Sequence, residues 1–585
     1  MFELKKILNQ KPDFSDSKKN ELLKLFSHKD FNTLSFQFIN LLKLYNETTI
    51  NDFTDKKYSE LAYFLETFLS IFTNESFLIP DNYLAVYINY NTIISNLVAI
   101  TPLNTTDTFI INLIGNSLHL EQNKLVKILT LFSLRNEYQI DYKLLFSSGD
   151  AASTLWYWEY FGLANFVKNI YCKNIEKHID NIELINEKAN IPSYMIHFAY
   201  FHATYAHKNK DKKIKEKINF LLLENYKEII IKNTPNNKKI AIISGFFFPE
   251  HSVYRVLYPF IESLSKDYDL TLIDLKSTEK ISDTRIFNKV INLKLKDNAF
   301  DLSEINENEF SIAFYPDIGM NQESVFLSNI RIAPVQIVGY GHPVSTFGSE
   351  IDYFLTGRSI ELTVKANENY SEKLLMIPGM GIKPVLPTYS AVGTEHCSVP
   401  TEDTSSLSRL IIACPWTYIK INYEQLQVLL KIQKLAKIDF KFRFLPAIPN
   451  DILYLCLKED IEVLLGKDNV EIITPQPYEK YMKFLNEADI IIDSFHFGGY
   501  NPIIDAVYLN KPVITIRGDK AYNRFAAALL DKLGLNQLIA DNYEDYTDKI
   551  LKLIHDKIYR EQIIKILSQI DLKNILDDKN ETKYF

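Results

Sequence analysis

Several features are scarce in this sequence, and each absence excludes a class of protein. No segment approaches the ~20 apolar residues needed to span a bilayer, and the first residues, MFELKKILNQKPDF, contain no secretory signal. Only four cysteines occur in 585 residues, far apart, which predicts neither a disulfide framework nor a paired-cysteine metal site. The net charge of -8 gives no general footprint for nucleic acid or anionic lipid. We therefore expect a cytoplasmic protein with no membrane span and no nucleic-acid partner.

Glycine-rich phosphate loops are also missing. No predicted strand is followed by a dinucleotide fingerprint or a Walker loop, which disfavours NAD-dependent and P-loop chemistry. The composition is otherwise that of a globular protein, with 46% hydrophobic and 24% charged residues. The length of 585 residues is too great for one core and predicts three to four domains.

Residues 1–236 are predicted to form an all-helical N-terminal domain. Apolar residues recur there at three- and four-residue spacing, as in NELLKLFSHKDFNTLSFQFINLLKLY, and no internal repeat is evident. A polar stretch, NTPNNK, ends this region and reads as a linker.

Two α/β domains are predicted after that linker. Short continuous apolar runs such as KKIAIISGFF, FSIAFYP and APVQIVGY alternate with helical segments over residues 237–387. After a Ser-, Thr- and Pro-rich stretch at 386–407, the pattern restarts with RLIIACPW and fills residues 405–585. Continuous apolar strands alternating with helices indicate parallel sheets covered on both faces. Two doubly wound, Rossmann-like sheets facing a cleft are the predicted fold class.

The segment DSFHFGGYNPIIDAV carries the strongest local signal for a ligand site. Gly499 belongs to a Gly-Gly turn that lets backbone approach a ligand, and Asn501 is placed to cap a helix whose first residue is Pro502. The exposed N–H groups at such a helix end suit a pyrophosphate, and Asp505 one turn later could reach a ribose hydroxyl. The alternative is a glycine turn followed by an ordinary helix cap.

Lys420, in PWTYIKIN, lies between a predicted strand and a predicted helix, on the same sheet edge as Asn501. A cation there would stabilise the negative charge that builds on a departing diphosphate. Thr417 could donate its hydroxyl to the same phosphate. The alternative for Lys420 is an ordinary solvated lysine.

Two histidines follow strands of the first α/β domain. His251 comes after the first strand and His342 lies in GYGHPVSTFG, so both fall on loops facing the predicted cleft. Ser252 is the predicted N-cap of the helix that follows His251. His197 and Tyr200, in SYMIHFAYFH, lie on a predicted apolar helix. The alternative to a role in the cleft is that both side chains only pack against other helices. The pair Asp267 and Asp269 precedes a strand instead of following one, so we expect no metal site.

The chain resembles glycosyltransferase family forty-one, which includes O-linked N-acetylglucosamine transferase and bacterial N-glucosyltransferases that modify adhesins. The resemblance runs from about Lys238 to Tyr546 and rests on TYIKIN, the glycine turn with Asn501 and Asp505, and PVITIRGDKAYNRFAAALLDKLG. The segments EHSVYR, YPDIGM and GHPVSTFGSEIDYFL are closer to the bacterial N-glucosyltransferases, which also carry an all-helical N-terminal domain.

The resemblance implies the GT-B architecture, two Rossmann-like domains facing a cleft, and a role for each candidate residue. Donor-binding roles fall on Gly341, His342, Thr417, Lys420, Gly499, Tyr500, Asn501 and Asp505. Acceptor-side roles fall on His197, Tyr200 and His251. His251 and Lys420 are the expected catalytic residues, and the position of His251 makes it the first candidate for the base. Neither a metal nor a cofactor is expected beyond the UDP-sugar substrate.

Three positions depart from the family pattern. Tyr500 replaces a small hydroxyl residue at the phosphate turn, Ser193 stands where an Asp is expected, and a glutamine expected after FKFRFLPA is not evident. We expect transfer of glucose from UDP-glucose to Asn in Asn-x-Ser/Thr sequons of a bacterial adhesin, with inversion. The alternatives are a Ser/Thr O-glycosyltransferase using UDP-N-acetylglucosamine or UDP-glucose, and a degenerate glycosyltransferase fold acting as a chaperone.

Overall fold

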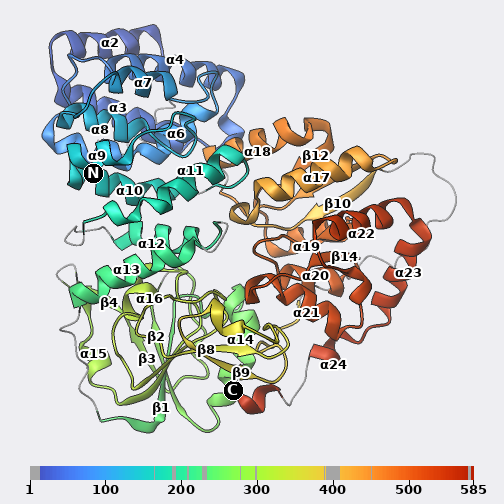
Figure 1. Cartoon of the computed structure of the whole chain (residues 1–585). Coiled ribbons are helices and arrows are strands. Elements are labelled where there is room, and N and C mark those ends of the chain that lie inside the picture. Colours follow the sequence, from blue (N-terminus) through green and yellow to red (C-terminus); the bar gives the residue numbers. More distant parts are fainter. Residues whose placement is uncertain are drawn as a thin grey trace. The chain divides into compact units, whose positions relative to one another are not determined.

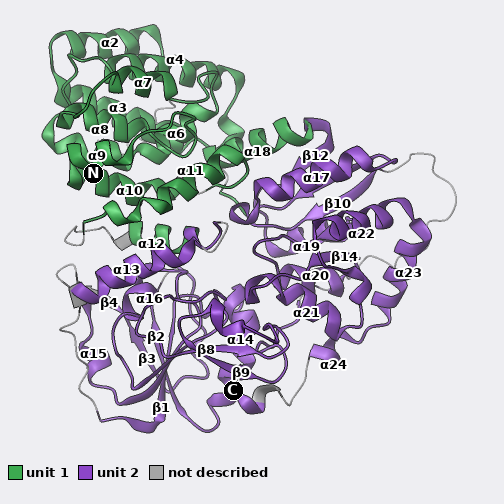
Figure 2. Ribbon diagram, in the orientation of Figure 1, with its two compact units in different colours: residues 1–202, 447–466 green, residues 203–446, 467–585 purple. Residues whose placement is uncertain are grey.

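The structure, a computed structural model, describes residues 14–163, 165–186, 193–206, 210–226, 234–276, 279–296, 299–387, 389, 409–449, 451–576 and 581–585. The chain forms two compact units, residues 1–202 with 447–466 and residues 203–446 with 467–585 (Figure 2). Cys397 and most of the predicted linker at 386–407 lie outside the described residues. The predicted domain boundaries, 1–236, 237–387 and 405–585, remain predictions.

The first unit is built from helices (Figure 1). The spacing of its apolar residues explains this: in α4, Leu61, Phe64, Leu65 and Phe68 are fully buried along one face. Its helices are α2 (Asp16–Ser27), α3 (Phe31–Asn46), α4 (Asp55–Phe72), α5 (Leu84–Asn89), α6 (Asn91–Ala99), α7 (Asp107–Ile114), α8 (Gln122–Leu131), α9 (Tyr142–Ser148), α10 (Asp150–Glu159), α11 (Asn169–Asp180), most of α12 (Ser193–Ala203), and α18 (Ile452–Leu465).

Helix α18 joins this unit from far along the chain and packs against α6 (Figure 2). Buried Asp460 of α18 forms an ion pair with Lys168, Nζ to Oδ1 2.5 Å, and its Oδ2 lies 3.7 Å from the guanidinium of Arg135. No helix was predicted at this position from the sequence. Its apolar residues form a short, nearly continuous run, in which helix and strand cannot be separated by periodicity.

A seven-stranded sheet forms the first half of the second unit, and all its paired neighbours are parallel. The last five residues of β1 are all buried, as expected for a strand covered on both faces. The strand order β3-β2-β1-β6-β7-β8-β9 reverses between β1 and β6, which places a ligand crevice at their carboxyl ends. The strands are β1 (Asn236–Ser244), β2 (Asp269–Asp274), β3 (Lys289–Asn292), β6 (Phe310–Tyr315), β7 (Val335–Val338), β8 (Tyr353–Gly357) and β9 (Lys373–Ile377).

A six-stranded parallel sheet forms the second half. Its order, β12-β11-β10-β13-β14-β15, reverses between β10 and β13, which pair in register at Ile412 with Ile490. The carboxyl ends of β10 and β13 therefore flank the second crevice. The strands are β10 (Leu410–Cys414), β11 (Phe440–Phe444), β12 (Val470–Ile472), β13 (Ile490–Ile492), β14 (Val513–Ile516) and β15 (Ile539–Ala540).

Helices alternate with the strands of both sheets along the chain. Strands β4 (Lys294–Lys296) and β5 (Ala299–Asp301) form a separate two-stranded antiparallel sheet. The helices of this unit are α13 (Asp211–Tyr226), α14 (Ser252–Leu264), α15 (Ser303–Asn306), α16 (Gln322–Leu327), α17 (Tyr423–Leu435), α19 (Tyr478–Asn486), α20 (Asn501–Tyr508), α21 (Phe525–Lys532), α22 (Tyr543–His555), α23 (Lys557–Ser568) and α24 (Leu572–Leu576). Together with the sheets they confirm the predicted fold class, helical N-terminal region followed by two parallel α/β halves.

Helix ends differ from the predictions by one residue at two places. The cap of α14 is His251 and not Ser252, because the imidazole Nδ1 accepts a hydrogen bond from the N–H of Val253. Helix α20 is preceded by Tyr500 as its N-cap, so Asn501 lies inside the first turn and does not cap it. None of the helices in the described part of the chain combines the length and apolar composition needed to span a bilayer.

Candidate active site

Lys420 lies where the order of the second sheet reverses. It ends the short 3-10 turn η6 (Tyr418–Lys420) that follows β10. Its Nζ donates a hydrogen bond of 2.7 Å to the carbonyl of Gly498 and lies 4.8 Å from the centre of the Phe497 ring. Burial lowers the pKa of Lys420 to about 8, against the opposing effect of the Asp493 carboxylate. The ammonium group is therefore still largely protonated at pH 7.

Backbone and indole hydrogen bonds fix the loop that carries Lys420. The N–H of Tyr418 donates 2.6 Å to the carbonyl of Pro446, and the Nε1 of buried Trp416 donates 2.7 Å to the carbonyl of Ile492. Thr417, the N-cap of η6, is exposed and makes no capping hydrogen bond. Its hydroxyl is thus placed at the surface of this loop, and its phosphate contact remains a prediction.

The turn after β13 closes over a buried carboxylate. Asp493 Oδ1 accepts hydrogen bonds from the N–H groups of Ser494 (2.9 Å) and Gly499 (2.7 Å), and Oδ2 accepts from the hydroxyl of Thr515 (2.8 Å). A Cβ at Gly499 would lie 3.0 Å from Oδ1, a tight contact that would press on this carboxylate. Burial raises the pKa of Asp493 to about 6. The glycine turn thus approaches Asp493, while its approach to a ligand remains a prediction.

Helix α20 begins directly after this turn. The Oδ1 of Asn501 is buried without a hydrogen-bond partner among the described residues, and its Nδ2 lies 3.4 Å from the carbonyl of Ser252. One turn later, Asp505 is 2% exposed, and its Oδ1 accepts hydrogen bonds from Arg255 (3.0 Å) and the hydroxyl of Tyr478 (2.8 Å). The helix end therefore offers an unsatisfied amide oxygen and a buried carboxylate.

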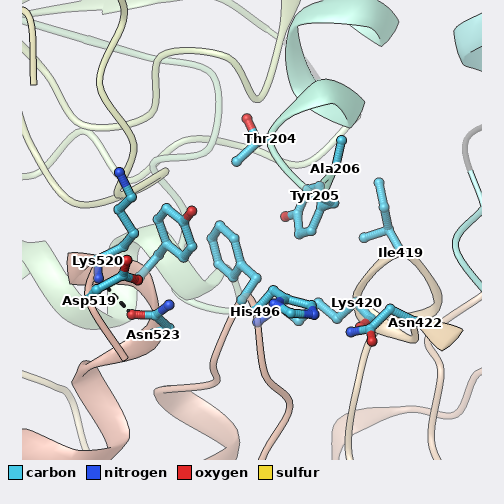
Figure 3. A pocket seen from close by; sticks show the side chains of 12 residues that line it. Thr204, Tyr205, Ala206, Ile419, Lys420, Asn422, His496, Asp519, Lys520 and Asn523 are labelled. Carbon is cyan, nitrogen blue, oxygen red and sulfur yellow. Dashed lines mark hydrogen bonds between the residues drawn. The ribbon is translucent and has the colours of Figure 1, made fainter. Parts of the chain in front are cut away.

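A polar cavity of about 210 Å³ opens beside Lys420. Figure 3 shows Lys420, Asn422 and His496 on one side and Asp519, Lys520 and Asn523 on the other. Aromatic rings from Tyr205, Phe497 and Tyr522 add an apolar wall: the centroid of the Phe497 ring lies 4.9 Å from that of Tyr205 and 4.8 Å from that of Tyr522. The polar side chains can form hydrogen bonds with the hydroxyls of a sugar, and the aromatic rings can pack against its apolar face.

Asp317 organises the crevice of the first sheet. Its Oδ2 accepts hydrogen bonds from the hydroxyl of Ser244 (2.5 Å) and the N–H of Gly245 (3.3 Å), while Oδ1 is buried without a partner among the described residues. Burial raises the pKa of Asp317 to about 7. A Cβ at Gly341 would lie 2.1 Å from the carbonyl oxygen of Pro316, so the loop with the predicted donor residues Gly341 and His342 rests against this strand end.

The geometry of His251 constrains its chemistry. Because Nδ1 accepts from a backbone N–H, the neutral imidazole carries its hydrogen on Nε2. Burial lowers the pKa of His251 to about 4, so this neutral form holds at pH 7. The ring also stacks on Phe246, with centroids 4.4 Å apart. His251 therefore presents a hydrogen-bond donor to its surroundings.

His342 reaches the aromatic wall of the cavity. Its ring lies nearly parallel to that of Phe497, with centroids 6.0 Å apart, and Nε2 is 3.3 Å from the hydroxyl of Thr204. His342 is buried and does not line the cavity itself.

His197 and Tyr200 belong to the first unit, on α12, whereas the other predicted site residues belong to the second. Tyr200 is buried and His197 partly buried. Their acceptor role remains a prediction.

Several residues of this site carried no role in the sequence analysis. Asp493 was present only as the first residue of DSFHFGGYNPIIDAV, and Arg255 only as part of EHSVYR. Lys520 and Tyr522, on the loop after β14, line the cavity. A search for charged residues after every strand of the second half would have found Asp493 and Lys520. No local signal identifies Arg255 as the partner of Asp505, 250 residues later.

No protein-family model matches the chain. It is 26% identical over 390 residues to the UDP-glucose:protein N-beta-glucosyltransferase of Actinobacillus pleuropneumoniae serotype 5b, covering 64% of this chain and 61% of that protein. It is 22% identical over 256 residues to the probable UDP-N-acetylglucosamine–peptide N-acetylglucosaminyltransferase SPINDLY of Hordeum vulgare, covering 42% of this chain and 26% of that protein. The chain thus spans about 61% of the length of the bacterial relatives.

Among solved structures, a mutant of the Thermobaculum terrenum O-GlcNAc transferase superposes with a TM-score of 0.56 at 16% identity, covering 97% of this chain and 92% of that one. This likeness confirms the predicted GT-B fold. The curated relatives confirm the predicted resemblance, since those named above are glycosyltransferases for UDP-sugars.

Proposed function

We propose that this chain transfers glucose from UDP-glucose to the side-chain amide of Asn in Asn-x-Ser/Thr sequons of a protein acceptor, with inversion at the sugar. One observation carries the proposal. A partly buried lysine and a helix N-terminus meet at the switch point of the second sheet, in a chain similar to proteins named UDP-glucose:protein N-beta-glucosyltransferase. The helical N-terminal unit is in keeping with this reading.

Charge stabilisation of the leaving UDP is the proposed contribution of the second half. The Lys420 ammonium is held toward the turn before α20 by Gly498, so it lies close to the N–H groups at the start of that helix. A β-phosphate bound there gains negative charge as its bond to the sugar breaks, and both groups favour that charge. Asn501 and Asp505 are proposed to contact the phosphate and the ribose. We expect catalysis without a metal.

The transferred sugar is proposed to occupy the cavity beside Lys420. One bond joins the sugar to the β-phosphate, so a diphosphate held by Lys420 places the sugar next to that side chain. The cavity of about 210 Å³ offers Asn422, His496 and Lys520 to sugar hydroxyls and the ring of Tyr522 to its apolar face. Orientation of the anomeric carbon would supply much of the rate enhancement.

In the proposed step, the amide nitrogen attacks the anomeric carbon on the face opposite UDP. A carbon–nitrogen bond forms, the bond between the anomeric carbon and the β-phosphate oxygen breaks, and the amide nitrogen loses a proton. Attack opposite the α-linked nucleotide gives a β product. The Nε2–H of His251 suits it to orient an acceptor oxygen, and its proton-bearing Nε2 argues against its predicted role as the base. The base stays unassigned.

The proposal also includes the kind of acceptor protein and the cellular location of the transfer. A bacterial adhesin as acceptor and cytoplasmic transfer follow from the resemblance to N-glucosyltransferases. The main rival is O-transfer of N-acetylglucosamine to Ser or Thr, favoured by the similarity to SPINDLY proteins. A third candidate function is that of a chaperone with a degenerate glycosyltransferase fold. It is suggested by Tyr500, which stands at the phosphate turn where a small hydroxyl residue is expected.

Product masses test these readings directly. The protein is incubated with UDP-glucose or UDP-N-acetylglucosamine and three matched peptides: one with a sequon, one with its Asn changed to Gln, and one with its Ser/Thr changed to Ala. We expect a hexose increment on the sequon peptide and none on the other two. An N-acetylhexosamine on the Gln peptide would establish the rival, and no product or UDP release with either donor would favour the chaperone.

A further inference from the structure

An arginine of the first half is paired with the predicted ribose carboxylate of the second half. Arg255 lies in the first turn of α14, and its Nη2 donates a hydrogen bond of 3.0 Å to Asp505 Oδ1 on α20. The hydroxyl of Tyr478 donates to the same oxygen at 2.8 Å, and the Arg255 guanidinium lies 5.5 Å from the centre of the Tyr478 ring. No described residue donates a hydrogen bond to Oδ2. Asp505 is therefore held through one oxygen, and the other is left for a further donor.

The pairing matters because Asp505 is almost completely buried. Its side chain is 3% exposed and that of Arg255 13%. Burial raises the pKa of Asp505, while the charge and hydrogen bond of Arg255 and the Tyr478 hydroxyl lower it. Among the described residues, Tyr481 of α19 is a further ionisable group near Asp505; its phenol is neutral near pH 7, and burial raises its pKa further. Losing the partner of a buried charge costs several kcal/mol, unless the group takes up a proton.

Contacts around Arg255 fix its position across the two sheets. The carbonyl of Arg255 accepts a hydrogen bond of 2.6 Å from the N–H of Val385, and Asn501 Nδ2 lies 3.4 Å from the carbonyl of Ser252. The N-terminus of α14, capped by His251, is thus tied to the N-terminus of α20.

We propose that Arg255 is a positioning residue for the nucleotide donor, which keeps the Asp505 carboxylate ionised and oriented so that Oδ2 can accept a ribose hydroxyl. This inference rests on the proposed function, in which Asp505 contacts the ribose. A protonated Asp505 would present one hydroxyl donor in place of a second acceptor, and the ribose contact would weaken. Arg255 itself need not touch the ligand.

The test measures UDP-glucose affinity by calorimetry at pH 6.0 and pH 7.5, as the ratio of each variant's Kd to that of the unaltered protein at the same pH. UDP-glucose is the probe because its diphosphate does not titrate in this window. For Arg255→Met we expect a Kd ratio above roughly 10 at pH 6.0, because the Asp505 carboxyl has lost its partner and takes up a proton. This ratio should fall at least about threefold by pH 7.5, because the Asp505 carboxyl ionises as the pH rises. Arg255→Lys keeps the charge, so its ratio should stay the same at both pH values.

Three further variants separate the possible outcomes. Arg255→Gln replaces Arg255→Met if the latter does not fold, and Arg331→Met, at an arginine whose side chain is 40% exposed, should leave affinity unchanged. Asp505→Asn should weaken binding at both pH values alike. If Asp505→Asn weakens binding but Arg255→Met does not, or if Arg255→Met and Arg255→Lys show equal losses independent of pH, the role of Arg255 is wrong while the donor site stands. If Asp505→Asn binds UDP-glucose normally, the proposed donor site itself fails.

Discussion

Replacing Lys420 with Met should make the protein more stable and nearly inactive. Burial brings the pKa of Lys420 from its ordinary 10.5 to about 8, and at about 1.36 kcal/mol per pKa unit this corresponds to roughly 3 kcal/mol. The loss of its hydrogen bond to Gly498 takes back about 1 kcal/mol. At pH 7 Lys420 is protonated in both the folded and the unfolded protein, so the full free-energy cost of burying its charge is present. This cost disappears as the pH rises from 8 toward 10.5. Lys420→Met should therefore gain about 2 kcal/mol at pH 7.

Thermal unfolding and turnover, measured on the same preparations, check this prediction. A gain of about 2 kcal/mol raises the unfolding midpoint by roughly 2–4 °C in a unit of this size. Loss of one preorganised charge at the leaving group should lower turnover of UDP-glucose about 10²–10³-fold. Lys431→Met, at an exposed lysine of α17, is the matched control and should change neither. A lower midpoint with turnover within about threefold of the unaltered protein would show that Lys420 is a structural residue and refute the reasoning.

Three other outcomes follow from the same site. Turnover should fall as pH rises above about 8, because Lys420 loses its proton there; a pH–rate profile flat to pH 9.5 would contradict this. EDTA should leave turnover unchanged, since Lys420 and the helix end supply the charge; loss of activity that Mg²⁺ or Mn²⁺ restores would show a metal requirement. The free energy of unfolding should fall as pH rises from about 4 through 7, because the pKa of Asp317 is raised to about 7 in the folded protein and its buried carboxyl must ionise there. Asp317→Asn should then unfold at a higher temperature than the unaltered protein at pH 8 but not at pH 4.5, and an equal difference at both pH values would argue against a titrating Asp317.

Local sequence patterns were enough to predict the fold. Continuous apolar runs such as IAIIS in β1 and the restart of the pattern at Arg409 identify two parallel sheets, because strands covered on both faces need apolar residues throughout. Helix α18 was missed because its apolar run has no clear period. The predicted caps Ser252 and Asn501 each lie one residue after the actual caps, His251 and Tyr500, because Ser and Asn are preferred cap residues whereas His and Tyr are not.

The candidate site was predictable only where it follows strand ends. Lys420 and Gly499 lie at the carboxyl ends of adjacent strands, and the structure joins their loops by the hydrogen bond from Lys420 to Gly498. The partnership of Arg255 with Asp505 depends on how the two sheets face each other, which no short-range pattern encodes. The tautomer of His251 likewise depends on a backbone contact that appears only in three dimensions.

The crystal structure of the protein with UDP tests the central claim most directly. The account predicts the β-phosphate within hydrogen-bond distance of Lys420 Nζ and of the backbone N–H groups at the start of α20, with the ribose at Asp505. Density for UDP at another place, or a diphosphate turned away from Lys420 at saturating nucleotide, would contradict it.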